Sequence, residues 1–277
     1  MINSTKIGLA LGSGSARGMS HIGVINALKK LGIEPDVVAG CSVGALVGAS
    51  YATANLDKLE DWAMSMTESN IRKFLSINFN ASGFVNANEL KSLFEQTIGL
   101  DSLMFKDMQR KFGAVATNLS TGQEVWLTSG SVHDALWSSM AFPGLFPSVL
   151  LDNKWLVDGG LVNPVPVSLC RAMGADTVIA VNLNADIISR YEVIDDENSQ
   201  LSKDHDSSEK NENFTFWEKT KASFQNLISS DDSKNKKPQG IEVISNSIDI
   251  MSSHLTHSRL AGDPPDVLLQ PRLNDVG

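Results

Sequence analysis

The stretch VVAGCSVGALVGASYA, residues 37–52, constrains the fold more than any other part of the sequence. Its β-branched apolar start predicts a buried strand, and the small apolar residues that follow predict a helix. The two meet at Gly-x-Ser-x-Gly, with Ser42 between Gly40 and Gly44. A sharp strand-to-helix turn of this kind holds a serine hydroxyl clear of the backbone, near a helix N-terminus that favours an anion. The pattern favours a nucleophile elbow, and a plain close-packing turn is the alternative.

The first part of the chain alternates between strand and helix patterns. Residues 6–11, 20–32, 35–40 and 43–54 predict strand, helix, strand and helix in turn. This alternation is typical of an α/β fold with parallel strands. Later segments predict a strand pair at 112–119 and 124–130, a short helix that Pro143-Gly144 ends, a hairpin at 149–160 with its turn at Asp152-Asn153, a helix and strand within 166–183, and a last strand at 266–271.

Composition excludes several classes of protein. The chain has 277 residues, 42% of them hydrophobic, and a net charge of −9. The acidic balance disfavours nucleic acid binding and gives no attraction to an anionic membrane. Two cysteines, Cys41 and Cys170, are the wrong number and spacing for a disulfide framework or a zinc site, so we expect a reducing compartment. The start of the sequence lacks a signal-peptide pattern and no run is long enough to span a bilayer, so a cytoplasmic protein is expected.

We expect a single domain over 1–277 that carries a polar insertion at about 185–240. The low complexity of this segment predicts mobility. Inside it, residues 214–228 carry an aromatic cluster, and two interpretations stay open: a helix docked on the domain, or a cover that touches lipid. After it, one stripe of apolar residues predicts a helix face packed on the sheet: Ile241, Ile244, Ile248, Met251 and Leu255.

The loop LGSGSARG, residues 11–18, follows the first strand. Parallel strands bring this loop and the Ser42 turn to the same sheet edge, so the backbone N–H groups of Gly14 and Ser15 are candidate donors to an oxyanion. A dinucleotide-binding loop is the competing interpretation. Arg17 stands where Gly-x-Gly-x-x-Gly needs its third glycine. The looser spacing of short-chain dehydrogenases fits, but neither tyrosine of the chain begins the Tyr-x-x-x-Lys pattern of those enzymes.

The candidate base is Asp158, which follows a predicted strand and precedes Gly159-Gly160. Such a position can hold a carboxylate rigidly, although Asp-Gly-Gly is also compatible with a plain turn. A Ser…Asp…His order would instead need His205, His254 or His257 as the base. None of the five histidines lies in a glycine-bounded turn after a strand, so Asp158 is preferred.

Taken together, GSGSARG, GCSVG and DGG, in this order and spacing, resemble the patatin-like phospholipase family. Residues 5–184 and about 240–271 look like its bacterial single-domain members, akin to the catalytic domain of neuropathy target esterase. The resemblance implies a three-layer α/β/α fold with a mostly parallel central sheet, and no metal or other cofactor. It also implies hydrolysis of acyl esters of lipids, phospholipid or lysophospholipid, by a Ser–Asp dyad through an acyl-enzyme. A regulatory or adaptor protein with little catalytic activity is the alternative.

The resemblance also implies a role for each motif. Ser42 is the nucleophile, Asp158 is the base, and the amides of Gly14 and Ser15 line the oxyanion hole. Arg17 matches the basic residue of the family's glycine loop. The other motif positions are Gly12, Gly18, Gly40, Gly44, Gly159 and Gly160. The resemblance implies that the binding partner is a lipid substrate. Peripheral contact of this cytoplasmic protein with a membrane, and binding of a protein partner, both stay open.

Two features depart from the family pattern. Ser13 and Ser15 interrupt what is usually an unbroken glycine run. Backbone donors survive this change where the backbone angles suit serine, so we expect a lower rate and not a loss of chemistry. The sequence also ends at NDVG, where the family usually continues into another helix, and a truncation that lowers stability is the corresponding expectation.

Overall fold

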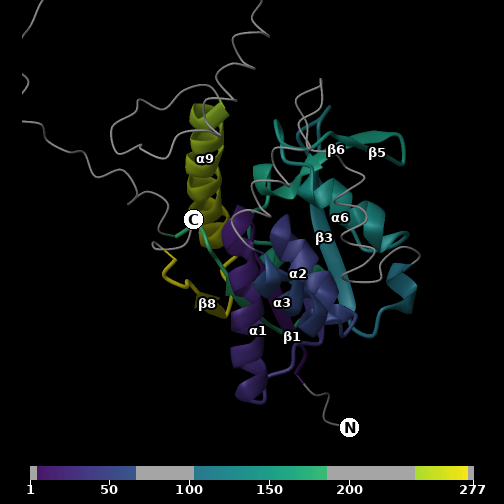
Figure 1. Ribbon diagram of the computed structural model, residues 1–277, viewed down its shortest axis with the longest axis vertical. Helices are drawn as coiled ribbons and strands as arrows, with labels where there is room; N and C mark the ends of the chain where they lie inside the picture. Colours follow the sequence, from purple (N-terminus) through teal and green to yellow (C-terminus); the bar gives the residue numbers. More distant parts are fainter. Residues whose placement is uncertain (1–4, 67–102, 186–240, 274–277) are drawn as a thin grey trace, which may run out of the picture.

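The computed structural model describes residues 5–66, 103–185 and 241–273 (Figure 1). In this part of the chain eight strands form one sheet. They are β1 (Ile7–Leu11), β2 (Val37–Cys41), β3 (Lys111–Asn118), β4 (Glu124–Leu127), β5 (Val149–Leu151), β6 (Lys154–Asp158), β7 (Thr177–Val181) and β8 (Val267–Leu269). The order across the sheet is β5-β6-β3-β2-β1-β7-β8, and β4 also pairs with β3.

The sheet is mostly parallel. Strands β3, β2, β1, β7 and β8 run in the same direction, whereas β4, β6 and β5 join through antiparallel pairs. The parallel strands end at one edge, where the Ser42 turn follows β2 and the glycine loop follows β1. Because β6 runs antiparallel to β3, it brings the chain back toward this edge. It ends with Asp158 opposite Ala116, one register position from the Cys41–Val115 pair.

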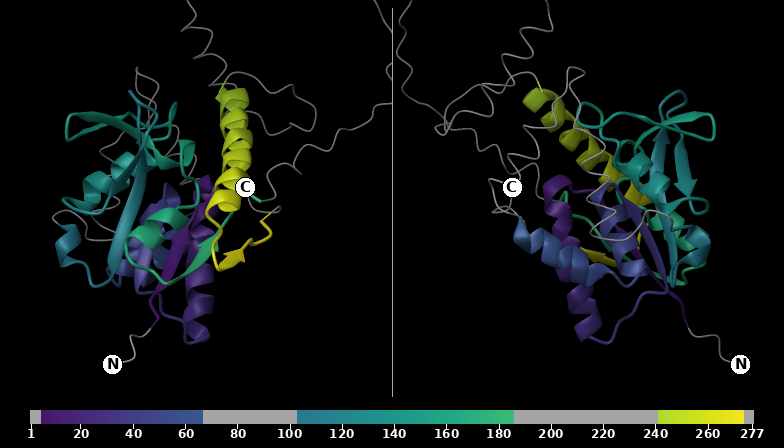
Figure 2. Two further views of the ribbon diagram at one scale, coloured as in Figure 1. Left: turned by 180° about the vertical axis from the view of Figure 1, so that it is seen from behind. Right: turned by 45° about the vertical axis from the view of Figure 1, so that its right-hand side comes forward.

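Helices cover both faces of the sheet (Figures 1 and 2). Their bounds are α1 (Ser20–Lys30), α2 (Val43–Ala52), α3 (Leu56–Ser65), α6 (Val132–Met140), α7 (Val167–Ala172) and α9 (Ile241–Gly262), with short 3₁₀ turns η1 (Ser15–Met19), η2 (Phe105–Asp107) and η3 (Gly159–Leu161). Helix α9 rises above the end of the sheet that carries β8, and β5 and β6 lie at the opposite end.

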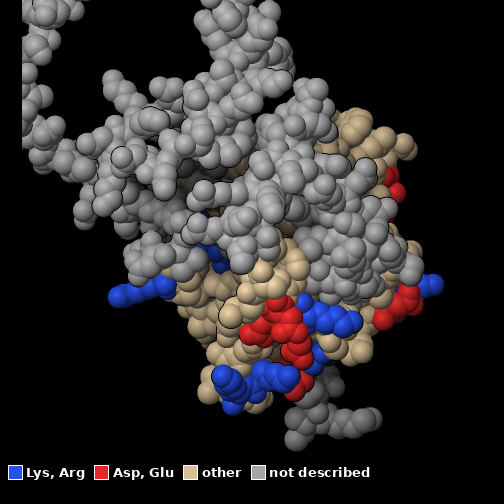
Figure 3. Space-filling view, in the orientation of Figure 1, with Lys and Arg blue, Asp and Glu red and all other residues tan. Residues whose placement is uncertain are grey.

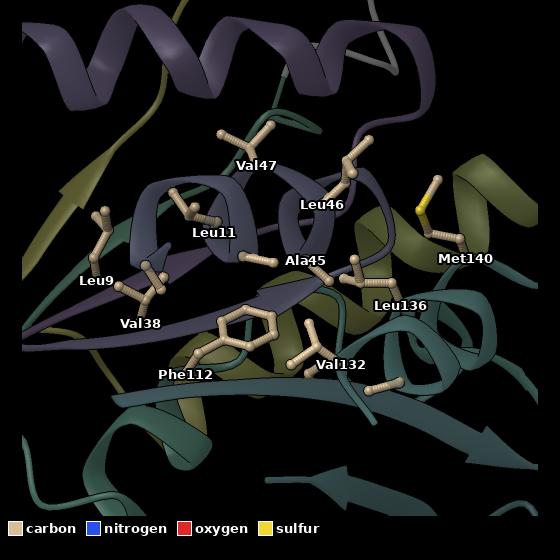
Figure 4. Packing of buried hydrophobic residues seen from close by; sticks show 14 of the residues in the cluster. Leu9, Leu11, Val38, Ala45, Leu46, Val47, Phe112, Val132, Leu136 and Met140 are labelled. Atoms are coloured by element: carbon tan, nitrogen blue, oxygen red, sulfur yellow. The ribbon is translucent and has the colours of Figure 1, made fainter. Parts of the chain in front are cut away.

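Side chains that alternate along the strands form two separate cores. In β1, Leu9 and Leu11 belong to the larger core under α1, α2, α3 and α6, and Ala10 belongs to the smaller core under α7. This is the period-two alternation of a strand that is buried on both faces. Figure 4 shows the larger core, with Phe112 of β3 beneath Ala45 of α2. Two cores on one sheet confirm the predicted three-layer α/β/α fold.

Most predicted elements are present, with one correction and one omission. Helix α9 was expected to pack its apolar stripe on the sheet, but Met251 is 59% exposed, whereas Ser253 and Thr256 are completely buried. The prediction of the packed face is therefore wrong for Met251, and Ser253 and Thr256 form part of the domain side of α9. Ile248 of the predicted stripe does face the domain, where it lines the pocket beside Ser42. The side chains of Ile241 and Ile244 lie outside the described residues. Helix α3 was not predicted. The expected insertion at 185–240 and the aromatic segment 214–228 lie almost entirely outside the described residues.

The visible surface mixes charges of both signs. In Figure 3, Lys and Arg side chains lie beside Asp and Glu side chains over the lower part of the visible surface, and the other described charges are scattered among uncharged residues. The part of the surface that can be seen therefore carries no uniformly basic patch of the kind that nucleic acid binding needs. None of the helices described by the structure is long and apolar enough to cross a bilayer.

Candidate active site

The turn between β2 and α2 explains why a serine stands between two glycines. Ser42 has φ 55° and ψ −126°, a conformation that is costly for a residue with a side chain. A Cβ on Gly40 would lie within 3 Å of Ala45 Cα, and one on Gly44 would lie equally close to the backbone oxygen of Leu11. Both glycines are needed because neighbouring backbone occupies that space, and the strained turn presents the serine hydroxyl at the sheet edge.

The hydroxyl of Ser42 meets the carboxylate of Asp158 at this edge. Ser42 Oγ donates to Asp158 Oδ2 over 2.6 Å. The second carboxylate oxygen, Oδ1, accepts the N–H of Gly160 at 2.7 Å. The backbone of Asp158 is also fixed, since Thr117 Oγ1 donates to its carbonyl at 2.7 Å. Two motifs that are 116 residues apart in sequence therefore form one hydrogen-bonded pair.

The environment of Asp158 makes its carboxylate a stronger base than usual. The residue is only 2% exposed, and this burial raises its pKa from 3.8 to about 6. The hydrogen bonds from Ser42 and Gly160 act in the opposite direction and hold the pKa below the value that burial alone would give. At neutral pH the carboxylate is still ionised, so it can accept a proton from the serine.

The described histidines are engaged elsewhere. His21 is completely buried, with its Nε2 2.8 Å from the carbonyl oxygen of Gly12, and burial lowers its pKa to about 4. His133 accepts a hydrogen bond from Trp137, and His257 Nδ1 lies 2.8 Å from the carbonyl oxygen of Ser253. His254 is exposed on α9. In the described residues no histidine contacts the Ser42–Asp158 pair, which favours a dyad over a triad; His205 lies outside them.

The glycine loop after β1 reaches the same pocket. The amide of Gly12 donates to the carbonyl of Val181, and that of Ser13 to the carbonyl of Pro164. Within the described chain, the amides of Gly14 and Ser15 have no acceptor, and both residues line the pocket beside Ser42. Ser15 adopts φ 49°, so a serine occupies a backbone conformation that a glycine would adopt without strain. The two free amides are suitably placed donors for an oxyanion.

Two side chains that hold this loop were not predicted from the sequence. Asn184, which follows β7, donates from Nδ2 to Ser13 Oγ at 3.2 Å and accepts from Arg17 at 3.4 Å. His21 supports Gly12 from the other side. Asn184 is 4% exposed and lines the pocket. The only sequence signal for Asn184 was its position after a predicted strand. In parallel sheets, residues at the carboxyl ends of strands often bind ligands.

The remaining motif glycines are required by close packing. A Cβ at each position would meet a neighbour: the backbone oxygen of Val181 for Gly12, the side chain of Val43 for Gly18, and the backbone oxygen of Val115 for Gly159. Gly160 is less crowded, and its contribution is the N–H that holds Asp158. Together these glycines let the loop, the elbow and the dyad turn approach one another.

One wall of the pocket is apolar. Phe142 and Leu161 lie beside the dyad, and Ile248 of α9 adds a further apolar side chain. Helix α9 is tied to the residues after the dyad, because Arg259 Nε donates to the carbonyl of Val162 at 2.9 Å and its NH2 group pairs with Glu124 at 2.9 Å. The arrangement suits a substrate with a polar ester group and an apolar chain.

The described residues hold no other evident reactive centre. Within them, no group of three His, Cys, Asp or Glu side chains is placed to bind a metal ion. Cys41 adjoins Ser42 but is completely buried, and burial raises the pKa of its thiol well above the usual value. A buried, protonated thiol packs as a small apolar residue and is a poor nucleophile.

The chain is similar to several known proteins. The family model "Patatin-like phospholipase" matches residues 9–171. An uncharacterized NTE family protein of Mycobacterium tuberculosis is 36% identical over 182 residues, which cover 66% of this chain and 50% of that protein. Patatin-like phospholipase domain-containing protein 6 of Homo sapiens is 29% identical over 192 residues, covering 67% and 14%. Lysophospholipase NTE1 of Pyricularia oryzae is 30% identical over 184 residues, covering 65% and 12%.

A solved structure, that of VipD from Legionella pneumophila, aligns with a TM-score of 0.48 and 14% identity over 94% of this chain and 67% of that one. The chain matches about half the length of its mycobacterial relatives. The family model covers more than half of the sequence, including the glycine loop, the elbow and the Asp-Gly-Gly turn. The chain therefore belongs to the patatin-like phospholipase family, and proteins of the NTE family are among its relatives.

Proposed function

We propose that this protein hydrolyses acyl esters of lipids, with Ser42 as the nucleophile and Asp158 as the general base. The observation that carries the proposal is the 2.6 Å hydrogen bond from Ser42 Oγ to Asp158 Oδ2 at a strained strand-to-helix turn. A serine is a weak nucleophile unless a nearby base takes its proton, and a hydrogen bond of this length provides the direct path. Membership of the family supports the same activity.

The proposed reaction has two halves. In the first, Ser42 Oγ attacks the ester carbonyl carbon while its proton passes to Asp158, and the amides of Gly14 and Ser15 receive the oxyanion. The tetrahedral intermediate collapses, the C–O bond to the alcohol breaks, and Asp158 returns the proton to the departing oxygen. In the second half, water gives a proton to Asp158 and attacks the acyl-enzyme. The acid then leaves and the proton returns to Ser42 Oγ.

The apolar pocket wall supports a lipid substrate. Phe142, Leu161 and Ile248 would contact the acyl chain next to the scissile carbonyl. A relative is named lysophospholipase, which makes a lysophospholipid the first natural ester to test. Attack on lipid in an aggregate would bring the protein to a membrane surface.

The proposal is tested with a panel of esters. We expect the purified protein to hydrolyse short soluble esters and lysophospholipid. We also expect kcat/KM to rise with the length of the acyl chain, because a longer chain contacts more of the apolar pocket wall. The carboxylic acid released from each ester is measured for the wild type, and Ser42→Ala, which lacks the proposed nucleophile, gives the background rate. Folded wild-type protein that hydrolyses none of these esters above this background rate would refute the proposal and favour a regulatory or adaptor role.

The raised pKa of Asp158 predicts the pH dependence of the reaction. Because the base must be ionised, kcat/KM for a soluble ester should be constant above pH of about 7 and fall about tenfold per pH unit below about 6. The measurement is the initial rate across pH, with circular dichroism to confirm that the protein stays folded. A rate that stays constant down to pH of about 4 would show that the base has the ordinary pKa of an exposed aspartate.

A further inference from the structure

The last turn of α6 contacts both members of the candidate dyad. The backbone N–H of Ser42 donates to Ser139 Oγ at 3.0 Å. Two residues further on, the carbonyl of Ala141 accepts the backbone N–H of Asp158, also at 3.0 Å. Ser139 and Ala141 are both completely buried. One short segment, which lies in none of the motifs that identify the family, therefore fixes the backbone on each side of the hydrogen bond between Ser42 and Asp158.

The contact with Ser139 stabilises the strained backbone conformation of Ser42. Ser42 has φ 55°, and a residue that is not glycine keeps such a conformation only when its surroundings enforce it. The flanking glycines leave room for the turn, but that room does not by itself hold Ser42 in this conformation. The hydroxyl of Ser139 binds the N–H of the strained residue itself, so it opposes any rotation that would carry Ser42 Oγ away from Asp158.

The neighbouring serine on α6 shows that this contact is not a general property of the helix. Ser138 is also completely buried, but its hydroxyl donates to the carbonyl of Asp134 at 2.8 Å, four residues earlier in the same helix. A bond of this kind is the ordinary choice for a serine inside a helix. In the described chain Ser139 makes no such bond, and its hydroxyl instead accepts the N–H of Ser42. Two adjacent, equally buried hydroxyls therefore serve different partners.

We propose that Ser139 is a positioning residue for the reaction: its hydroxyl holds the backbone of Ser42 so that Oγ stays within hydrogen-bond distance of Asp158. The inference rests on the proposed function, because it concerns the same nucleophile. Ser139 acts through Ser42 and does not touch the substrate; it does not line the pocket that holds Ser42 and Asp158.

Removing this hydroxyl should affect turnover more than binding or folding. In Ser139→Ala the N–H of Ser42 loses its acceptor in a region too closed for a side chain to replace it. A shift of about 1 Å in a reacting group can cost about 100-fold in rate. We expect kcat to fall roughly 10- to 100-fold, with KM changed less than about twofold, since the pocket wall is untouched.

The experiment compares Ser139→Ala with Ser138→Ala. Each variant removes one buried hydroxyl from the same helix turn, so losses of packing and helix stability should match. Three quantities are measured on the full chain: kcat and KM for a soluble ester, the melting temperature, and amide hydrogen exchange at Ser42. We expect only Ser139→Ala to lower kcat, and we expect it alone to speed Ser42 exchange by about tenfold or more.

The outcomes separate this proposal from the proposed function. Equal kcat losses in the two variants, or unchanged kcat in folded Ser139→Ala, would overturn the positioning role and leave Ser139 as a packing residue. Unchanged exchange at Ser42 would overturn it as well, and this readout needs no catalysis. A wild type without esterase activity would refute the proposed function. The exchange comparison would then decide by itself whether Ser139 holds the elbow.

Discussion

Asp158→Asn is expected to abolish ester hydrolysis and, at the same time, to make the protein more stable at neutral pH. The amide has the shape of the carboxylate but cannot accept the proton of Ser42, so kcat should fall by about 10⁴-fold or more. The N–H of Gly160 keeps an acceptor, because the Oδ1 atom is retained. The turn should therefore keep its structure while the chemistry is lost.

The gain in stability follows from the pKa of Asp158. Burial raises the pKa from 3.8 to about 6, so the folded state holds the proton more tightly than the unfolded state does. Stability therefore falls as the pH rises from about 4 to about 6, and above pH 6 the buried charge costs on the order of 3 kcal/mol. Asparagine has no charge to bury. We expect its melting temperature to exceed that of the wild type at pH of about 7 and to approach it at pH of about 4.

The measurement pairs kcat with melting temperature at both pH values. Asp61→Asn, an exposed substitution on α3, serves as the matched control and should change neither quantity appreciably. A folded Asp158→Asn variant that still turns over ester would show that the base lies elsewhere. In that case Ala variants of His254, His257 and the undescribed His205 would identify it. With Asp158 as base, each of those variants should keep most of its activity.

Ser42→Ala should remove turnover to a similar extent, about 10⁴-fold or more, because no acyl-enzyme can form without the hydroxyl. Alanine at φ 55° is strained about as much as serine, but Oδ2 of the buried Asp158 loses its donor, so we expect stability at neutral pH to fall by about 1–3 kcal/mol. The control is Ser50→Ala on α2, where a buried hydroxyl donates to the carbonyl of Leu46 at 2.8 Å and takes no part in the site. A folded Ser42→Ala protein with wild-type turnover would contradict the assignment of the nucleophile.

Much of the fold could be predicted because short sequence patterns indicate individual strands, helices and turns. The strand-to-helix change at Ser42 appears within residues 37–52, and the turn at 149–160 is marked by Asp152 and Asn153. Both of these turn residues adopt the positive φ that Asp and Asn tolerate better than most other residues. The pairing of Ser42 with Asp158 could be expected because each member stands at the end of a predicted strand. Parallel topology brings the glycine loop and the Ser42 turn to one sheet edge, whereas Asp158 reaches that edge at the end of the antiparallel strand β6.

The rest of the site depends on contacts that leave no local pattern. Ser139 and Asn184 reach their partners over 97 and 171 residues of sequence, and nothing near either residue marks the contact. The apolar stripe on α9 was misleading at Met251, because the pattern shows that one face is apolar but not what each part of that face packs against. Helix α3 had a usable signal in Leu56, Leu59 and Trp62, which lie at helical spacing.

The central claim is that Ser42 is an activated nucleophile, and a fluorophosphonate probe tests it most directly. Such probes form a covalent bond with a serine hydroxyl only where a base and an oxyanion site make it reactive. The folded wild-type protein is treated with the probe, digested, and mapped by mass spectrometry, with Ser42→Ala treated in parallel. We expect one adduct, on Ser42, that is absent from the variant. An unlabelled folded protein, or an adduct on a different serine, would contradict it.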